Sequence, residues 1–497
     1  MEVLELDSLF LSKRILVDTE ECKDFVSGGV LVSNIDGTIK RIFTSQEEIN
    51  SWMFRSTGAD VYDFKNKIIM SGLIDANVNI CSGSGLEDFS SITKAASAGG
   101  YTCIVDNPMF SKPATTTLKN LKAKIVDARS KNSLNIDVGF WGGVTRDNHD
   151  ELIAMANQGV CGFKAILNPQ DSHPDFSHLC KEDLKKALEV LEEINCVFAI
   201  KPDMELKEPI IPENANLKDY NTYLTMKHPS MEKCGIEMVL DLIKEHKMKI
   251  HLTDLSSSEF APLIQKYRNQ KTPKQSTLSV ETSLHYLSLA SEEIGSGMTE
   301  YKCSPPIRNG KNKRQLWDSM KMYDFFNISS SHLPSSIKTK CLIGGRNRGN
   351  FIEAANGISS LQFGLPIFWT ECRKNRMSIH DVHQFMSCNP AKLCGFDKNK
   401  GKLKPGYDAD FCIWDPDEEW TITKEATLFK NIISPYFGKT VVGRVYATVV
   451  RGYFVYDANR PNETDEPIGT VVLKKPMKRS ERAIRFTDND NNEDDEL

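Results

Sequence analysis

From about Met70 onward, short apolar runs of the chain alternate with longer stretches of helical periodicity. The apolar runs include CIVDNP, DVGFWGG, CGFKAIL, CVFAIK and KIHLTDL, and the stretches between them include TLKNLKAKIVDARSK, KEDLKKALEVLEEIN and IEMVLDLIKEHK. Strands that alternate with helices of this length form βα units, which join into a parallel sheet with its site at the carboxyl ends of the strands. The pattern predicts an α/β fold over residues 66–399.

The two ends of the chain have a different pattern, in which short apolar runs are broken by Gly, Asp and Asn. Examples are GGVLVS near the start and VVGRVYATVVRGYFVYD near the end. Such runs are typical of short strands joined by tight turns. The simplest arrangement pairs residues 1–65 with residues 400–475 in one composite β domain. The last segment, 476–497, ends in FTDNDNNEDDEL and is predicted to be an acidic, disordered tail.

The composition argues against several classes of partner. A net charge of −5 gives no broad basic field for nucleic acid, and no apolar run is long enough to span a membrane. The start, MEVLELDSLFLSKRILV, lacks the basic residues and the long apolar run of a secretion signal. The 13 cysteines are scattered without CxxC spacing, which favours a reducing, cytoplasmic location.

Polar or special residues end many of the predicted barrel strands, where a parallel fold turns side chains toward a ligand. Asn77 and Asn79 lie two residues apart and therefore share one side of the strand end. The complete set is Asn77, Asn79, Asp106, Trp141, Lys164, Lys201, Asp254, Glu281 and His332.

Eight motifs along the chain resemble those of allantoinases, which are cyclic amidohydrolases. They are DVGFWGGV, GFKAIL, SVETSLHYL, EYKCSPPIR, NGISSLQFGLP, NPAKLCGF, GYDADFCIWDP and SPYFGKTVVGRV, within a similarity that runs from about residue 10 to 475. The resemblance implies a TIM-like (β/α)8 barrel of the amidohydrolase type, a small composite β-sandwich domain built from both chain ends, and a homotetramer. It also implies that two divalent metals, mostly zinc, activate a water that opens allantoin to allantoate.

The family's metal centre is the part of the pattern that this sequence departs from. The family has a His-x-His pair, a carboxylated bridging lysine, two later histidines and a catalytic aspartate. By resemblance these fall, in order, on Asn77 and Asn79, on Lys164, on Lys201 and Asp254, and on Ser331. Only Lys164 matches, so no cofactor is expected. The alternative is one or two zinc ions with carboxylated Lys164. The resemblance also places Ser304, Pro305, Arg308 and His332 near the substrate pocket.

The histidines give a check that needs no resemblance. The chain has ten, and no two are separated by a single residue. The closest pair, His380 and His383, lies in a helical stretch where surface or packing histidines are commoner than ligands. A two-metal centre of the family's kind is therefore not expected.

Two hypotheses about side-chain roles follow from charge. Lys164 in an apolar strand needs an anion, a carbamate or a lowered pKa, and Asp254 supplies the anion. If Lys164 and Lys201 both face Asp254, their ammonium groups replace the metal cations. Arg308 either contributes to the substrate pocket or pairs with a carboxylate at the barrel rim, and the sequence does not choose between these.

Three functional interpretations remain. The first is an inactive, oligomerising or regulatory paralogue of an active allantoinase, as a homo-oligomer or a hetero-oligomer with that paralogue. The second is an active allantoinase or related cyclic-amide hydrolase that holds one metal through a non-standard set including Asp254 and His332. The third is a small-molecule sensor that keeps the pocket.

Overall fold

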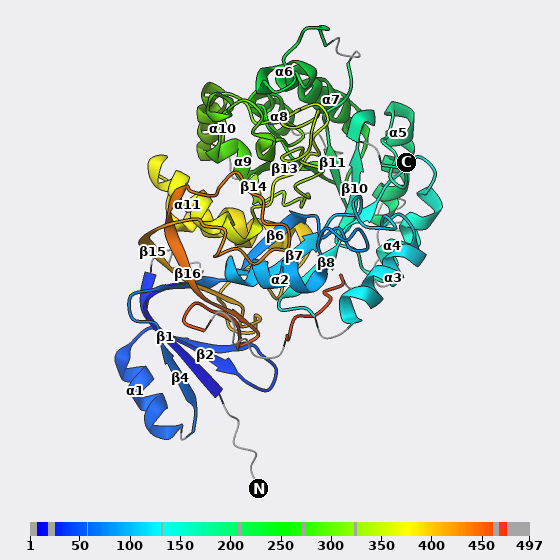
Figure 1. Ribbon diagram of the computed structural model, residues 1–497. Coiled ribbons are helices and arrows are strands. Elements are labelled where there is room, and N and C mark those ends of the chain that lie inside the picture. Colours follow the sequence, from blue (N-terminus) through cyan, green and yellow to red (C-terminus); the bar gives the residue numbers. More distant parts are fainter. Residues whose placement is uncertain are drawn as a thin grey trace, which may run out of the picture.

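The computed structural model has two parts, a barrel and a β domain beside it (Figure 1). The residues that the structure describes are 7–17, 25–56, 58–130, 133–171, 173–206, 211–270, 275–322, 326–460 and 467–474. The predicted acidic tail therefore lies outside the described residues. Within them, no helix is long and apolar enough to cross a membrane.

The barrel consists of eight parallel strands. They are β6 (Leu73–Val78), β7 (Tyr101–Asp106), β8 (Asp137–Phe140) with its continuation β9 (Gly142–Gly143), β10 (Gly162–Ile166), β11 (Val197–Lys201), β12 (Lys249–Leu252), β13 (Thr277–Ser283) and β14 (Phe326–Ser329). Each strand pairs with the next in parallel register. A parallel bridge from Val78 in the first strand to His332, in the segment that follows the last strand, closes the barrel.

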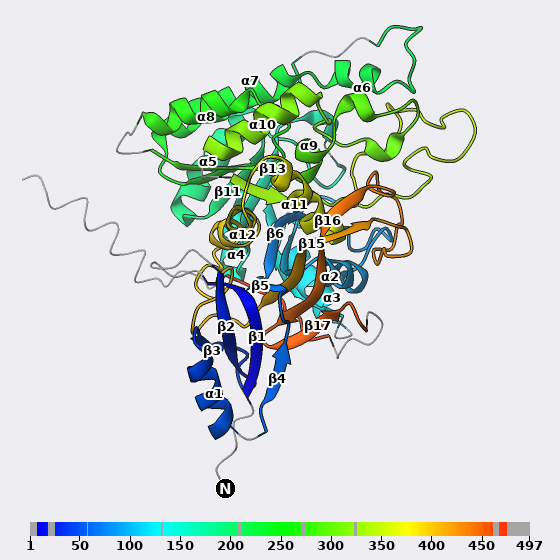
Figure 2. The same ribbon diagram turned by 90° about the vertical axis from the view of Figure 1, so that its left-hand side faces the viewer.

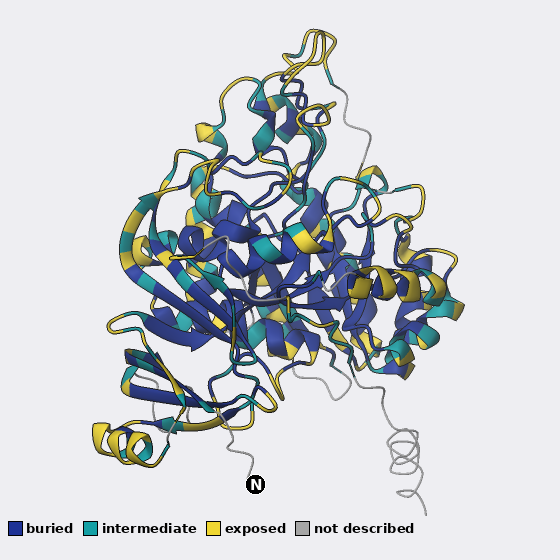
Figure 3. Cartoon of the chain, turned by 60° about the horizontal axis from the view of Figure 1, so that its bottom comes forward, coloured by how far each residue is buried: buried dark blue, intermediate teal, exposed yellow. Residues whose placement is uncertain are grey.

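Helices cover the outside of the barrel, which explains why its strands read as continuous apolar runs. Those helices are α2 (Phe89–Ala98), α3 (Leu118–Arg129), α4 (Leu152–Gln158), α5 (Lys181–Ile194), α6 (Tyr220–Met226), α7 (Pro229–Leu242), α8 (Phe260–Asn269), α9 (Leu284–Ser288), α10 (Gly310–Met322), α11 (Gly364–Lys374), α12 (Ile379–His383) and α13 (Asn389–Cys394). In α5, Leu184, Leu188 and Leu191 are fully buried at helical spacing. The strands are buried, whereas exposed residues lie on outer helix faces and loops (Figure 3).

The β domain is a single mixed sheet that takes strands from both ends of the chain. The early strands are β1 (Asp7–Leu16), β2 (Phe25–Ser33), β3 (Ile39–Phe43), β4 (Asp60–Asp63) and β5 (Ile68–Ser71), with α1 (Gln46–Arg55) beside them, and the late strands are β15 (Phe411–Thr421), β16 (Thr440–Val450) and β17 (Tyr453–Asp457). Strand β15 pairs antiparallel with β5, so the two ends meet in the middle of the sheet (Figure 2). The rings of Phe10 and Phe411 pack edge to face, with centroids 5.1 Å apart. The predicted α/β fold, a TIM-like barrel with a β domain built from both chain ends, is thus confirmed. That domain is one mixed sheet and not the predicted sandwich, because β15 pairs directly with β5 and joins the strands of both ends. The residue boundaries of the two domains stay predictions.

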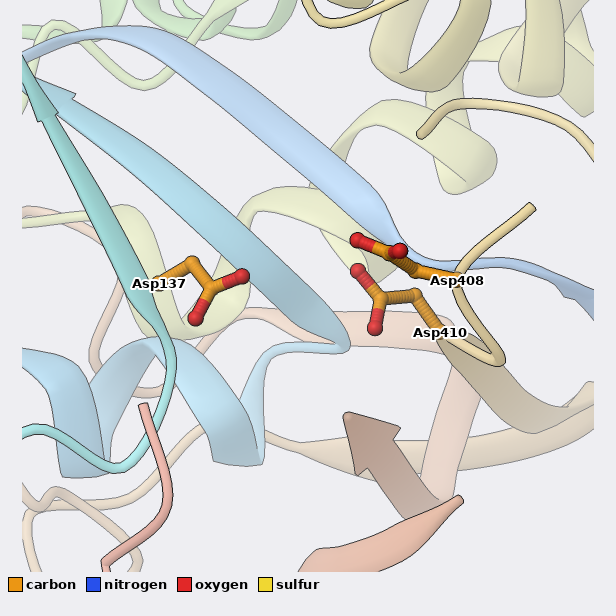
Figure 4. Close-up of side chains that lie close together, drawn as sticks. All are labelled: Asp137, Asp408 and Asp410. Carbon is orange, nitrogen blue, oxygen red and sulfur yellow. The ribbon is translucent and has the colours of Figure 1, made fainter. Parts of the chain in front are cut away.

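A buried charge cluster joins the β domain to the amino-terminal end of the barrel. Asp137 opens strand β8, while Asp408 and Asp410 lie just before β15, and the three carboxylates converge (Figure 4). Lys400 Nζ lies 2.7–2.8 Å from an oxygen of each, and Arg451 Nη1 lies 2.7 Å from Asp137 Oδ2. Burial alone would raise the pKa of Asp137, but Lys400 and Arg451 outweigh it and hold that pKa at about 2. Asp137 is therefore ionised at neutral pH.

Replacing Lys400 with Met is expected to lower the free energy of unfolding by about 3–5 kcal/mol, because buried carboxylates lose the cation that they share. Chemical denaturation measures this loss. Lys404→Met, at an exposed position four residues away, is the matched control and should change stability by less than about 0.5 kcal/mol. Equal effects from the two variants would contradict a structural role for the cluster.

Candidate functional site

A cavity of about 510 Å³ opens at the carboxyl ends of the barrel strands. It is bounded by strand ends and by the loops that follow them. Asn77 and Lys164 reach it from β6 and β10, and Lys201 from the last position of β11. All six positions to which the resemblance assigns metal or catalytic groups line this one cavity: Asn77, Asn79, Lys164, Lys201, Asp254 and Ser331.

Lys164 is surrounded by acceptor oxygens in the cavity wall. Its Nζ donates to Asn77 Oδ1 at 2.8 Å and to Asn107 Oδ1 at 3.1 Å, and it lies 3.8 Å from Asp254 Oδ2. Two hydrogen bonds to amide oxygens, together with electrostatic attraction to a carboxylate, suit an ammonium group. Lys164 is thus held by the groups that surround it.

Asn77 connects the lysine to the acidic groups of the site. Its Nδ2 donates to Asp254 Oδ1 at 3.0 Å and to Glu281, while its Oδ1 accepts from Lys164. Asn79 has a different role, because its main-chain N and its Nδ2 both donate to the His332 carbonyl at 2.9 Å. Asn79 therefore joins β6 to the segment after β14 and helps to close the barrel.

Asp254 and Ser331 are in direct contact, and both have unusual backbone conformations. Ser331 Oγ donates to Asp254 Oδ1 at 2.8 Å, and the φ angle is 58° at Asp254 and 43° at Ser331. Left-handed conformations are uncommon outside glycine and cost of order 1 kcal/mol each. Burial alone would raise the pKa of Asp254, but Lys164 and Lys201 outweigh it and hold that pKa below its ordinary value.

Lys201 has a partner that the sequence did not identify. Its Nζ lies 2.5 Å from Asp171 Oδ2 and 3.8 Å from Asp203 Oδ1. Burial would lower the pKa of Lys201, but Asp171, Asp203 and, more weakly, Asp254 raise it above the ordinary value. Lys164 therefore faces Asp254, as the hypothesis for the two lysines expects. The direct contact of Lys201 is with Asp171 instead.

Of the four residues predicted to lie near the substrate pocket, some line the cavity and others lie behind its wall. Ser304 lines the cavity and donates to Asp171 at 3.2 Å, but Pro305 is not among the lining residues. Arg308 lies behind the wall, where its Nη2 donates to Glu232 Oε1 at 2.9 Å, so it pairs with a carboxylate instead of facing the cavity. His332 is fully buried, and its Nδ1 accepts from two main-chain N–H groups, those of Ser360 and Leu361.

Comparison with known proteins places this site in a family. Residues 68–455 match the model of the amidohydrolase family. The chain belongs to the amidohydrolase family. The amidohydrolase is similar to the mitochondrial allantoinase of Aquarana catesbeiana, with 36% identity over 80% of this chain and 78% of that one. Its identity to the allantoinase of Saccharomyces cerevisiae is 32%, over 82% and 86% of the two chains. The predicted resemblance to allantoinases is confirmed.

The fold of this amidohydrolase also matches a solved structure. L-hydantoinase (dihydropyrimidinase) from Arthrobacter aurescens superposes on it with a TM-score of 0.81 over 94% of this chain and 99% of that one. The sequence identity between the two is 23%, so the match bears on the fold alone.

The residues at the mouth of this amidohydrolase do not fit a two-metal centre. Asn77 and Asn107 turn oxygens toward Lys164, which suits a donor ammonium and not a carbamate, since carbamate oxygens cannot donate hydrogen bonds. Among the described residues, the one group of three His, Cys, Asp or Glu side chains close enough to share an ion is Asp137, Asp408 and Asp410. That group lies at the opposite end of the barrel, and Lys400 Nζ is within 2.8 Å of all three.

Sequence reasoning missed several residues that the amidohydrolase site depends on. Asp171 and Asn107 lie in loops after β10 and β7, where no periodicity indicates which way a side chain points. The sequence predicts Glu281 as a strand-end residue but does not assign it to the site. A search for anions to balance two buried lysines would have raised Asp171 and Asp203 as candidates, because Asp203 follows Lys201 by two residues.

The pairing of Lys201 can be tested with a double-mutant cycle. Lys201→Met should destabilise the protein by about 3–5 kcal/mol, because it leaves Asp171 as a buried charge that has lost its closest partner. Adding Asp171→Asn should recover part of that loss, with a coupling of about 0.5–3 kcal/mol. The control cycle combines Lys201→Met with Asp254→Asn and should show weaker coupling by chemical denaturation. Stronger coupling to Asp254 would mean that the original charge hypothesis was right.

Proposed function

We propose that this protein is an allantoinase-like member of the amidohydrolase family that does not hydrolyse allantoin. The observation that supports this most is the environment of Lys164, whose Nζ contacts two amide oxygens and faces Asp254. In the family pattern that lysine bridges two metals. Here ammonium groups take the place of the metal cations, so the cavity keeps its charge balance without metal.

The proposed loss of activity follows from the chemistry that hydrolysis needs. A hydroxide forms at neutral pH only when cations with open coordination positions lower the pKa of a bound water. An ammonium group has no coordination position to offer. Ser331, at the position of the family's catalytic aspartate, is a poor base because its hydroxyl remains protonated at neutral pH, and it already donates to Asp254.

The role that we propose is non-catalytic. The fold extends over the full barrel and β domain, and similarity to allantoinases covers four-fifths of the chain. A retained scaffold with an altered site suits an oligomerising or regulatory partner of an active allantoinase, either as a homotetramer or in a mixed oligomer. The cytoplasm remains the predicted location.

One observation favours the sensor interpretation as a second candidate. The cavity measures about 510 Å³, which lies within the range of small-molecule sites, and polar side chains converge on it. The remaining alternative, a non-standard metal site that includes Asp254 and His332, is less favoured. His332 Nδ1 already accepts two hydrogen bonds, and His332 is not among the residues that line the mouth cavity.

Metal analysis and an allantoin assay on the same preparation test the proposal. We expect less than about 0.1 equivalent of zinc per chain by mass spectrometry, and no turnover above the buffer rate, also after incubation with zinc. The allantoinase of Saccharomyces cerevisiae is the positive control. About two equivalents of metal together with turnover would overturn the proposal.

Rebuilding the family's ligands should require the whole set. Replacing Asn77, Asn79, Lys201 and Asp254 with His, and Ser331 with Asp, places the family pattern around Lys164. The fivefold variant is expected to bind zinc in an equilibrium titration, whereas each single variant binds none, because ligands that act together are strongly non-additive. Hydrolysis should stay slow, since surrounding groups remain unadapted. Zinc binding by a single variant would contradict the assignment of positions.

A further inference from the structure

A second cavity lies beside the mouth cavity, and we call it the side cavity. It measures about 310 Å³. Gln170, Asp171, Ala355 and Asn356 line both cavities and so form the wall between them. The proposed function uses no residue that lines only the side cavity, and the inference drawn from it does not depend on whether allantoin is hydrolysed.

Lys227 brings a buried ammonium group to the side cavity. The residue is 6% exposed, and its Nζ has no hydrogen-bond partner among the described residues. The nearest carboxylate oxygens belong to Asp171 and Asp203, at 3.8 and 3.9 Å. These distances give electrostatic attraction without a hydrogen bond. Lys227 lines the side cavity, and its buried Nζ has no hydrogen bond to satisfy it within the described part of the chain, which is costly for an ammonium group.

The position of Lys227 is fixed by the protein around it. Arg308 donates from Nη1 to the Lys227 carbonyl, and the same guanidinium donates to Glu232 Oε1 at 2.9 Å. Glu232 in turn accepts from the main-chain N of Ser256 at 2.8 Å. These contacts fix the main chain of Lys227 beside the cavity, so a ligand has only the lysine side chain left to order.

The charges around the side cavity leave room for one more anion. Among the residues that line it, Lys227 and Lys302 supply two ammonium groups, while Asp171 supplies one carboxylate. Burial, reinforced by the charge of Lys227, lowers the pKa of Lys302 to about 8, so Lys302 is largely protonated at neutral pH. The local balance is one positive charge in excess.

We propose that the side cavity binds a small aliphatic monocarboxylate, whose carboxylate accepts hydrogen bonds from Lys227 Nζ. One negative charge balances the excess, whereas a phosphate dianion would exceed it next to two carboxylates. The walls also include the apolar side chains of Met226 and Ile352. A volume of about 310 Å³ is larger than one inorganic ion needs, so these walls suit the hydrocarbon part of an organic acid.

Saturation-transfer NMR with sodium butyrate as the probe tests the proposal on the full chain. Butyrate should receive saturation from the wild-type protein, and inorganic phosphate should not compete with it. Lys227→Met should weaken the apparent affinity by about tenfold or more, because the charge-assisted donor is lost. Lys233→Met, at an exposed position on α7, is the matched control and should bind butyrate like the wild type.

A second variant keeps the test valid if Lys227→Met fails to fold. Met226 lines only the side cavity, so Met226→Trp fills that space and leaves every charge in place. It should abolish butyrate binding while thermal unfolding shows a folded protein. The proposal is overturned if wild-type protein does not bind butyrate, if Met226→Trp binds it unchanged, or if phosphate displaces it.

Discussion

Buried ammonium groups at the mouth of the barrel set the main constraint on this molecule. A charge removed from water needs compensation nearby, and Lys164 and Lys201 both end in the barrel interior. Their carboxylate partners come from three different segments: Asp254 after β12, Asp171 after β10, and Asp203 after β11. Loops far apart in the sequence must therefore converge. Their convergence shapes the cavity, which is where the resemblance to allantoinases places two metals.

The same constraint explains the conformation of the loops. Asp254 and Ser331 adopt left-handed backbone angles, which are strained for side chains with a Cβ atom. The strain is offset because these angles bring the Asp254 carboxylate toward Lys164 and the Ser331 hydroxyl toward Asp254. These contacts balance the charge of the buried lysine and link Asp254 to both neighbouring segments.

The sequence was sufficient for the fold and for the strand-end part of the site, and the reason is periodicity. Alternating βα segments fix a parallel barrel, and strand-end residues such as Lys164 and Lys201 must then face its mouth. The pairing of those residues could not be read in the same way. Lys201 contacts Asp171 across a loop whose path depends on tertiary packing, so the sequence suggested Asp254 instead. For the same reason the sequence leaves the role of Arg308 open, whereas in the structure its partner is Glu232.

The two ends of the barrel separate stability from chemistry, which explains how a site can change while its fold persists. Lys400, Asp137 and Asp410 lie at the amino-terminal end, where they tie the barrel to the β domain without contacting the mouth cavity. Substitutions at the mouth leave that junction intact, provided that each new charge finds a partner. We propose that Asn77, Lys201 and Asp254 stand where the family pattern has histidines, and these groups meet the condition. Lys201 contacts Asp171, and Asp254 lies 3.8 Å from Lys164, so neither new charge is left without a neighbour of opposite sign.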